Sequence, residues 1–229
     1  GDFDKIITEA ADKAGIRIYP VTSGLVADGK DLGSNYSSLK HKPAVALIGG
    51  DGVSTGGFGE LWFFLERELE YPYTIIGLDY LSSVDLGEYD VVLLPSGSYT
   101  RHKDKLAEYV KEGGRLVAFE SAIRLFASEE TTSLYKAVEA RKKEKEKEED
   151  KLSSTDTAHL KKYENQRRER LKERSAGSIY RIGLDETHPY AFGLGNEWFM
   201  MKTSSDHYPF LASGNNIAYI LDNEPVAGF

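Results

Sequence analysis

Between residues 43 and 119, short apolar segments alternate with helical patterns, and this alternation restricts the fold more than any other feature. The predicted strands are 44–48, 73–78, 91–94 and 116–119, and helices are predicted over 58–69 and about 103–112. The strands are apolar along their length instead of alternating apolar and polar residues. Such strands need cover on both faces, which is typical of parallel strands between helices. We therefore predict an α/β fold with a doubly wound, mostly parallel sheet and helices on both faces.

The segments on either side of this core have different patterns. Residues 3–14 predict a helix ended by Gly15, residues 16–20 a short strand, and residues 22–42 a polar connecting segment rich in Gly and Ser. We interpret residues 1–42 as the join from a preceding domain and 43–229 as the main domain. Beyond the core, 178–184 predicts an edge strand, and 198–202 and 217–221 predict two further strands.

The helix predicted over 58–69 is strongly aromatic. Its spacing places four apolar residues on one face, namely Leu61, Phe64, Leu65 and Leu69. Trp62, Phe63 and Phe64 are consecutive. Packing in the core is the prediction for these aromatic residues, and an aromatic wall of a ligand site is the alternative.

A charged insert occupies about residues 129–176. Residues 139–151 are almost wholly charged, and a second charged stretch covers 161–174. Acidic and basic residues alternate there, which favours a solvated helical hairpin with intrahelical ion pairs. The formal net charge of -8 also argues against nucleic acid as a partner. A module that recruits a protein partner through 139–174 is a further alternative.

Composition excludes several kinds of chemistry. There are no cysteines, so disulfides, thiolate nucleophiles and Cys-ligated metals are ruled out. No apolar run approaches the roughly 20 residues of a membrane span, and the first residues lack the pattern of a signal peptide. The sequence begins without Met. We therefore expect no membrane span, and we interpret the chain as a piece of a longer protein.

A strand runs directly into a helix start at residues 116–126. In other proteins this geometry presents a catalytic Cys or Ser, but here the turn carries Glu120 and Ser121. The loops after two other strands end at the same edge of the sheet, where ligands bind in open α/β folds. The predicted binding residues are Gly50, Asp51, Ser96, Gly97, Ser98, Glu120 and Ser121.

Three side chains are candidates for catalysis: Glu60, Ser121 and His188. A serine nucleophile needs an adjacent base, and His188 is the histidine of the second half that lies near a predicted strand end. The carboxylate of Glu120 beside the nucleophile would oppose a developing oxyanion. We therefore favour a degenerate, non-catalytic site. An independent small-molecule amidase or esterase that uses Ser121, Glu60 and His188 is the alternative.

Three segments carry a resemblance to a known superfamily. Residues 45–50, 89–97 and 113–118 resemble the core of class I glutamine amidotransferase-like proteins. This resemblance implies a flavodoxin-like fold. It matches the loop glutamate of the superfamily to Glu60 and the elbow cysteine to Glu120 or Ser121.

A narrower resemblance is carried by 31–34, 52–54, the stretch leading from 167 into 181, and 185–193. These segments look like the C-terminal region of large bacterial secreted zinc carboxypeptidases. The resemblance implies an upstream peptidase domain as a partner, a peptide substrate as a further partner, and an extracellular or periplasmic location. It also implies that the zinc belongs to the upstream domain. The expected function is then a non-catalytic accessory or binding domain of such an enzyme.

The metal motifs of that family are not found in this sequence. The family uses a His with a Glu three residues later, together with a distant His. None of the five histidines of the sequence has a Glu at that spacing. They are His41, His102, His159, His188 and His207. We therefore expect neither a metal site nor a cofactor in this chain.

Overall fold

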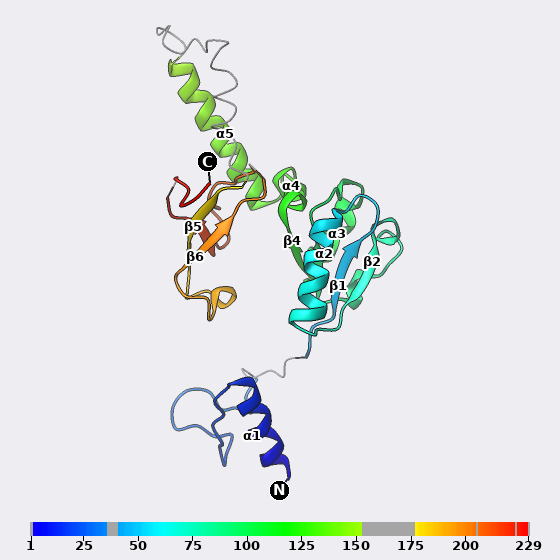
Figure 1. The fold of residues 1–229 in the computed structure, drawn as a ribbon, viewed down its shortest axis with the longest axis vertical. Coiled ribbons are helices and arrows are strands. Elements are labelled where there is room, and N and C mark those ends of the chain that lie inside the picture. Colours follow the sequence, from blue (N-terminus) through cyan, green and yellow to red (C-terminus); the bar gives the residue numbers. More distant parts are fainter. Residues whose placement is uncertain (1, 36–40, 153–176, 205, 223, 229) are drawn as a thin grey trace. The chain divides into compact units, whose positions relative to one another are not determined.

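The computed structural model describes residues 2–35, 41–152, 177–204, 206–222 and 224–228 (Figure 1). The chain divides into two compact units, Gly1–Lys42 and Pro43–Phe229. Each unit is described by itself below.

The described residues of the first unit form one helix, α1 (Asp2–Ala14). The helix ends at Gly15, whose φ of 65° lies in the left-handed region that glycine adopts readily. The Ile16 N–H then bonds the Ala11 carbonyl at 2.9 Å, which completes the helix end. The strand predicted over 16–20 is wrong: these residues form no ladder in the described part of the chain. A strand needs a partner, and the local sequence pattern does not supply one.

The second unit is built on a parallel sheet of four strands, β1 (Val45–Gly49), β2 (Thr74–Gly77), β3 (Val91–Leu94) and β4 (Arg115–Ala118). The strand order is β2-β1-β3-β4, the order of flavodoxin-like sheets. Leu47 lies beside Ile75 on one side and Leu93 on the other. The predicted doubly wound α/β fold is therefore confirmed. β3 has the predicted ends, and each end of the other three strands differs from its prediction by one residue.

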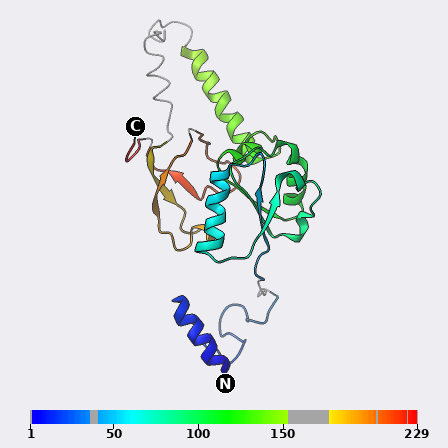
Figure 2. The same ribbon diagram turned by 45° about the vertical axis from the view of Figure 1, so that its right-hand side comes forward.

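Helices follow the strands on both faces of this sheet (Figures 1 and 2). α2 (Thr55–Phe63) follows β1, and α3 (Lys103–Lys111) lies on the opposite face between β3 and β4. Short 3₁₀ turns complete the connections: η2 (Leu78–Tyr80), η3 (Leu86–Glu88) and η4 (Thr100–His102). After β4 the chain enters η5 (Glu120–Ile123) and α4 (Arg124–Ala127).

The core lies mainly between the sheet and α3. Alternate strand residues point to this face, among them Ala46, Ile48, Val92 and Leu94, all fully buried. Leu106 and Tyr109 of α3 pack against them. Because Val92 and Leu94 of β3 are packed in this core, the loop that follows Leu94 is held at the carboxyl edge of the sheet.

The aromatic helix differs from its prediction. It changes at Phe64 into a π-helical turn, η1 (Phe64–Glu68), closed by the Leu69 N–H on the Phe64 carbonyl at 2.9 Å. A π turn holds more residues than an α turn, so the 3.6-residue spacing no longer predicts the buried face. Leu65 is buried, but Phe64 and Leu69 are half exposed. Trp62 and Phe63 are also 41% and 49% exposed, so the prediction that they pack in the core is wrong.

The last part of the unit holds a long helix and a second sheet. α5 (Ser133–Leu152) contains the first charged stretch, whereas the second, 161–174, lies outside the described residues. β5 (Ile179–Leu184), β6 (Glu197–Met201) and β7 (Ala218–Ile220) form an antiparallel sheet in the order β6-β5-β7, and η8 (Pro189–Ala191) connects β5 to β6. The predicted edge strand 178–184 is therefore the central strand. A strand's own sequence does not state how many partners it has.

None of the described helices combines the length and the apolar composition that crossing a membrane requires.

Candidate functional site

The turn after β4 is strained at Glu120. Phe119 is extended, with φ -111° and ψ 141°, and the next residue, Glu120, has φ 48°. A non-glycine residue in this left-handed region costs about 1–2 kcal/mol. This is the elbow position of a strand-turn-helix junction, which presents its side chain at the edge of the sheet. The structure therefore assigns the elbow to Glu120 and not to Ser121.

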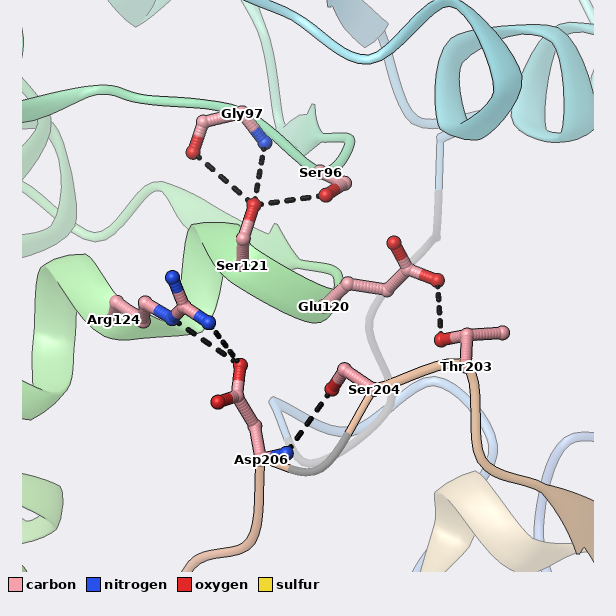
Figure 3. A network of polar contacts seen from close by, with 8 residues as sticks. All are labelled: Ser96, Gly97, Glu120, Ser121, Arg124, Thr203, Ser204 and Asp206. Atoms are coloured by element: carbon pink, nitrogen blue, oxygen red, sulfur yellow. Dashed lines mark hydrogen bonds and ion pairs between the residues drawn. The ribbon is translucent and has the colours of Figure 1, made fainter. Parts of the chain in front are cut away.

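The Glu120 side chain is exposed and accepts a hydrogen bond from a residue that follows strand β6 of the second sheet. The Thr203 hydroxyl donates to Glu120 Oε1 at 2.7 Å (Figure 3). Thr203 follows β6 closely in sequence. The residue at the elbow is therefore a carboxylate with a fixed partner, where an enzyme of this geometry would place a nucleophile.

The Ser121 hydroxyl joins the elbow to the loop after β3. Its Oγ accepts a hydrogen bond from the Gly97 N–H at 2.9 Å and lies 2.8 Å from Ser96 Oγ (Figure 3). It also lies 3.4 Å from the Gly97 carbonyl. A hydroxyl, an amide N–H and a carbonyl cannot act as a general base. The contacts of Ser121 are therefore those of a structural hydroxyl.

The loops after β1 and β3 pair with each other beside the elbow. The Ser54 N–H bonds the Ser96 carbonyl at 2.7 Å, and the Ser98 N–H bonds the Gly52 carbonyl at 3.1 Å. Gly97 is required at this crossing, because a Cβ there would lie 2.9 Å from the Gly52 carbonyl oxygen. The close pairing places both loops against the Ser121 hydroxyl.

A cavity of about 580 Å³ opens at this edge of the sheet. Its lining residues are Gly52, Ser54, Ser96, Gly97, Ser98, Tyr99, Thr100, Ser121, Ala122, Arg124, Leu125 and Ser128. Most of these side chains carry hydroxyl groups, one carries a guanidinium, and none is a carboxylate. The lining therefore suits a ligand that is rich in hydrogen-bond acceptors.

The structure brings together four of the predicted binding residues, Ser96, Gly97, Ser98 and Ser121, all of which line the cavity. Gly50, Asp51 and Glu120 are not among the lining residues. Gly50 shapes the loop after β1, since its φ is 98° and its carbonyl accepts from the Val53 N–H at 3.1 Å.

The three catalytic candidates are not brought together in the cavity. Glu60 is an exposed residue of α2, and neither Glu60 nor His188 lines the cavity that contains Ser121. His188 caps η8, where its Nδ1 accepts from the Tyr190 N–H at 3.2 Å, and its Nε2 lies 3.3 Å from Asn215 Nδ2. Both ring nitrogens of His188 are thus engaged within its own turn and with Asn215.

Arg124, which lines the cavity, forms an ion pair with Asp206. This ion pair was not predicted from the sequence. Asp206 Oδ2 accepts from Arg124 Nη2 at 2.7 Å and from Nε at 3.2 Å (Figure 3). The hydrogen bond to Asp206, together with its charge, raises the pKa of Arg124 above its ordinary value. The two residues are 82 positions apart, so no local pattern connects them.

Tyr99 is a buried member of the lining. It is 2% exposed, and its hydroxyl donates to the Pro95 carbonyl at 2.8 Å. Burial raises the pKa of the Tyr99 phenol well above its ordinary value, because the phenolate would lose its hydration. Tyr99 therefore stays neutral at physiological pH.

The fold and the site define a class: a doubly wound α/β module whose strand-turn-helix elbow carries a glutamate. Comparison with protein-family models and with curated proteins gives no match. Among solved structures, the chain is similar to a protein from Thermoplasma acidophilum that is provisionally described as one of the subunits of GMP synthase. That similarity has a TM-score of 0.46 and 12% identity over 80% of this chain and 75% of the other. A similarity of this size does not assign a family.

Proposed function

We propose that this chain is a non-catalytic accessory or binding domain of a secreted zinc metallocarboxypeptidase, whose peptidase chemistry lies in an upstream domain. The observation that carries the non-catalytic part is Glu120 at the elbow, with φ 48° and a hydrogen bond to Thr203. Hydrolysis by an elbow site needs a nucleophile with an adjacent base. Glu120 is a poor replacement, because its negative charge would destabilise an oxyanion formed beside it.

The contacts of Ser121 support the same proposal. Its oxygen already accepts from the Gly97 N–H, and the two ring nitrogens of His188 have other partners. The amidase or esterase alternative would require a base to approach Ser121 at hydrogen-bond distance. None of the contacts described for Ser121 favours that alternative.

The choice of parent enzyme rests on the sequence segments that resemble secreted zinc carboxypeptidases. One of them, residues 185–193, forms a tight turn in which Asp185 Oδ1 accepts from the Thr187 hydroxyl at 2.6 Å and from its N–H at 3.1 Å. These bonds lower the pKa of Asp185 and keep it ionised.

Zinc does not fit the residues described here. Across the described ranges, no three His, Asp or Glu side chains are grouped so that they could hold a metal ion. In this proposal, which follows the resemblance to secreted zinc carboxypeptidases, the zinc belongs to the upstream domain of the parent enzyme, and that domain is the proposed partner within the same chain. An extracellular or periplasmic location belongs to the same proposal.

The proposal is tested in two experiments. The chain is first assayed against a broad set of esters, amides and peptides, with Ser121→Ala as the matched control. We expect no turnover above that of the variant, and Ser121-dependent turnover would refute the non-catalytic role. The gene is then read upstream for a His-x-x-Glu pair with a later His. A longer product without these residues, or without zinc-dependent carboxypeptidase activity, would refute the proposed parent.

A further inference from the structure

The cavity beside Ser121 has the chemistry of a carboxylate receptor. Arg124 is the guanidinium in its lining, and the lining has no carboxylate. The hydroxyls of Ser54, Ser98 and Thr100 line the same space and can donate hydrogen bonds. An arginine fork surrounded by neutral donors favours a planar anion with two acceptor oxygens.

Asp206 shows which group Arg124 recognises. Its carboxylate oxygen lies within hydrogen-bond distance of two guanidinium nitrogens, whereas the third nitrogen points away from Asp206 (Figure 3). The side chains of Arg124 and Asp206 are 64% and 34% exposed. Ion pairs that stay in contact with solvent contribute little to stability, and Arg124 is mostly exposed, so a ligand can exchange with Asp206 at small cost.

We propose that this cavity binds the C-terminal carboxylate of a short peptide, which replaces Asp206 on Arg124. The choice of a peptide rests on the proposed function, and the carboxylate chemistry rests on Arg124 and its neighbours. A volume of about 580 Å³ lies within the usual range for small-ligand sites, roughly 300–1,000 Å³. The hydroxyls along the cavity then donate to the peptide carbonyls, and Asp206 acts as an internal competitor.

The test is a calorimetric titration of the chain with N-acetyl-trialanine as the free acid and as the C-terminal amide. We expect the acid to bind at least about tenfold more tightly than the amide. Arg124→Gln is expected to remove this preference and to leave the weak binding of the amide unchanged. Asp206→Asn is expected to tighten binding of the acid by up to about fivefold, because it removes the competing charge.

Three further measurements make the test specific. Arg101→Gln changes an exposed arginine outside the lining, and this variant is expected to bind as the unsubstituted chain does. Arg124→Lys keeps the charge without the fork, and its preference for the acid is expected to lie between those of the unsubstituted chain and Arg124→Gln. This variant is used instead of Arg124→Gln if the latter does not fold. Free alanine is titrated in parallel, and tighter binding of the tripeptide than of alanine supports a peptide as the ligand.

Several outcomes would overturn the proposal. They are equal binding of acid and amide, no binding of either, a preference that survives Arg124→Gln, and binding of alanine as tight as that of the peptide. Weaker binding by Asp206→Asn would show that the pair is only structural, because competition predicts the opposite sign. Turnover of the peptide would refute the non-catalytic role by itself, since binding is measured separately.

Discussion

The hydroxyl oxygens of Ser96 and Ser121 lie 2.8 Å apart, although the residues are separated by 25 positions in the sequence. Ser96 follows β3 and Ser121 follows the elbow after β4, so this contact connects the ends of two neighbouring strands. The hydroxyl that sequence patterns present as a nucleophile therefore holds the loops of the cavity together.

Replacing Ser121 with alanine should destabilise the chain. The change leaves the Gly97 N–H without its acceptor, and an unsatisfied, partly buried amide costs about 1–3 kcal/mol. Urea denaturation measures the loss in the free energy of unfolding. Ser98→Ala is the control, since Ser98 is exposed, and should change it by less than about 0.5 kcal/mol. Equal effects of the two variants would contradict the structural role of Ser121.

Replacing Glu120 with glycine should be better tolerated than replacing it with alanine. Both variants lose the Thr203 contact, so their difference isolates the backbone strain at φ 48°. Glycine should be more stable by about 1 kcal/mol in thermal or urea unfolding. Glu108 is an exposed residue within α3 and serves as the control position. There the alanine variant should be more stable than the glycine variant by about 0.5–1 kcal/mol. The same order at both positions would argue against an elbow at Glu120.

Adding one methyl group at Gly97 should disturb the site. The new Cβ would meet the Gly52 carbonyl at 2.9 Å, and backbone on both sides has little room to move. We expect Gly97→Ala to cost about 1–3 kcal/mol of stability. Gly59 lies in α2, and apart from its neighbours in the helix no atom lies within 4 Å of the new Cβ. Gly59→Ala should therefore be neutral or stabilising by up to about 1 kcal/mol. A tolerant Gly97 would show that the two loops separate easily.

The buried Tyr99 should make stability fall at alkaline pH. Its pKa is raised in the folded chain, so above its ordinary value of about 10 the unfolded chain releases the proton while the folded chain retains it. The linkage makes stability fall as pH rises above about 10, by at most about 1.4 kcal/mol for each pH unit. Tyr99→Phe should remove this contribution, so the free-energy difference between parent and variant should be constant from about pH 7 to 9 and change above that range. A difference that does not vary with pH would contradict the burial.

The parallel sheet was predicted well because each of its strands is marked by the residues of the strand itself and by its immediate neighbours in the sequence. Strand β3 was predicted at Val91–Leu94 and is found there, since an apolar run with turn residues on both sides defines its own boundaries. The strand at 16–20 and the buried face beyond Phe64 failed for the opposite reason. A strand depends on a distant partner, and a π turn changes the periodicity on which the prediction depends.

The candidate site was predicted in part. Ser96, Gly97, Ser98 and Ser121 were placed at one edge because the carboxyl ends of parallel strands lie together, and they line one cavity. Arg124 was missed, because nothing in its local sequence marks it as a partner of Asp206.

By itself, the sequence determined that the central part of this protein is a covered parallel sheet, because strands that are apolar on both sides must be buried on both sides. It also determined that no thiolate can act here, since there is no cysteine. Only the tertiary structure decided that Glu120 and not Ser121 is the elbow residue, because that depends on one backbone angle. It alone brought Asp206 to Arg124, since a contact across 82 residues is set by the path of the chain and leaves no local pattern.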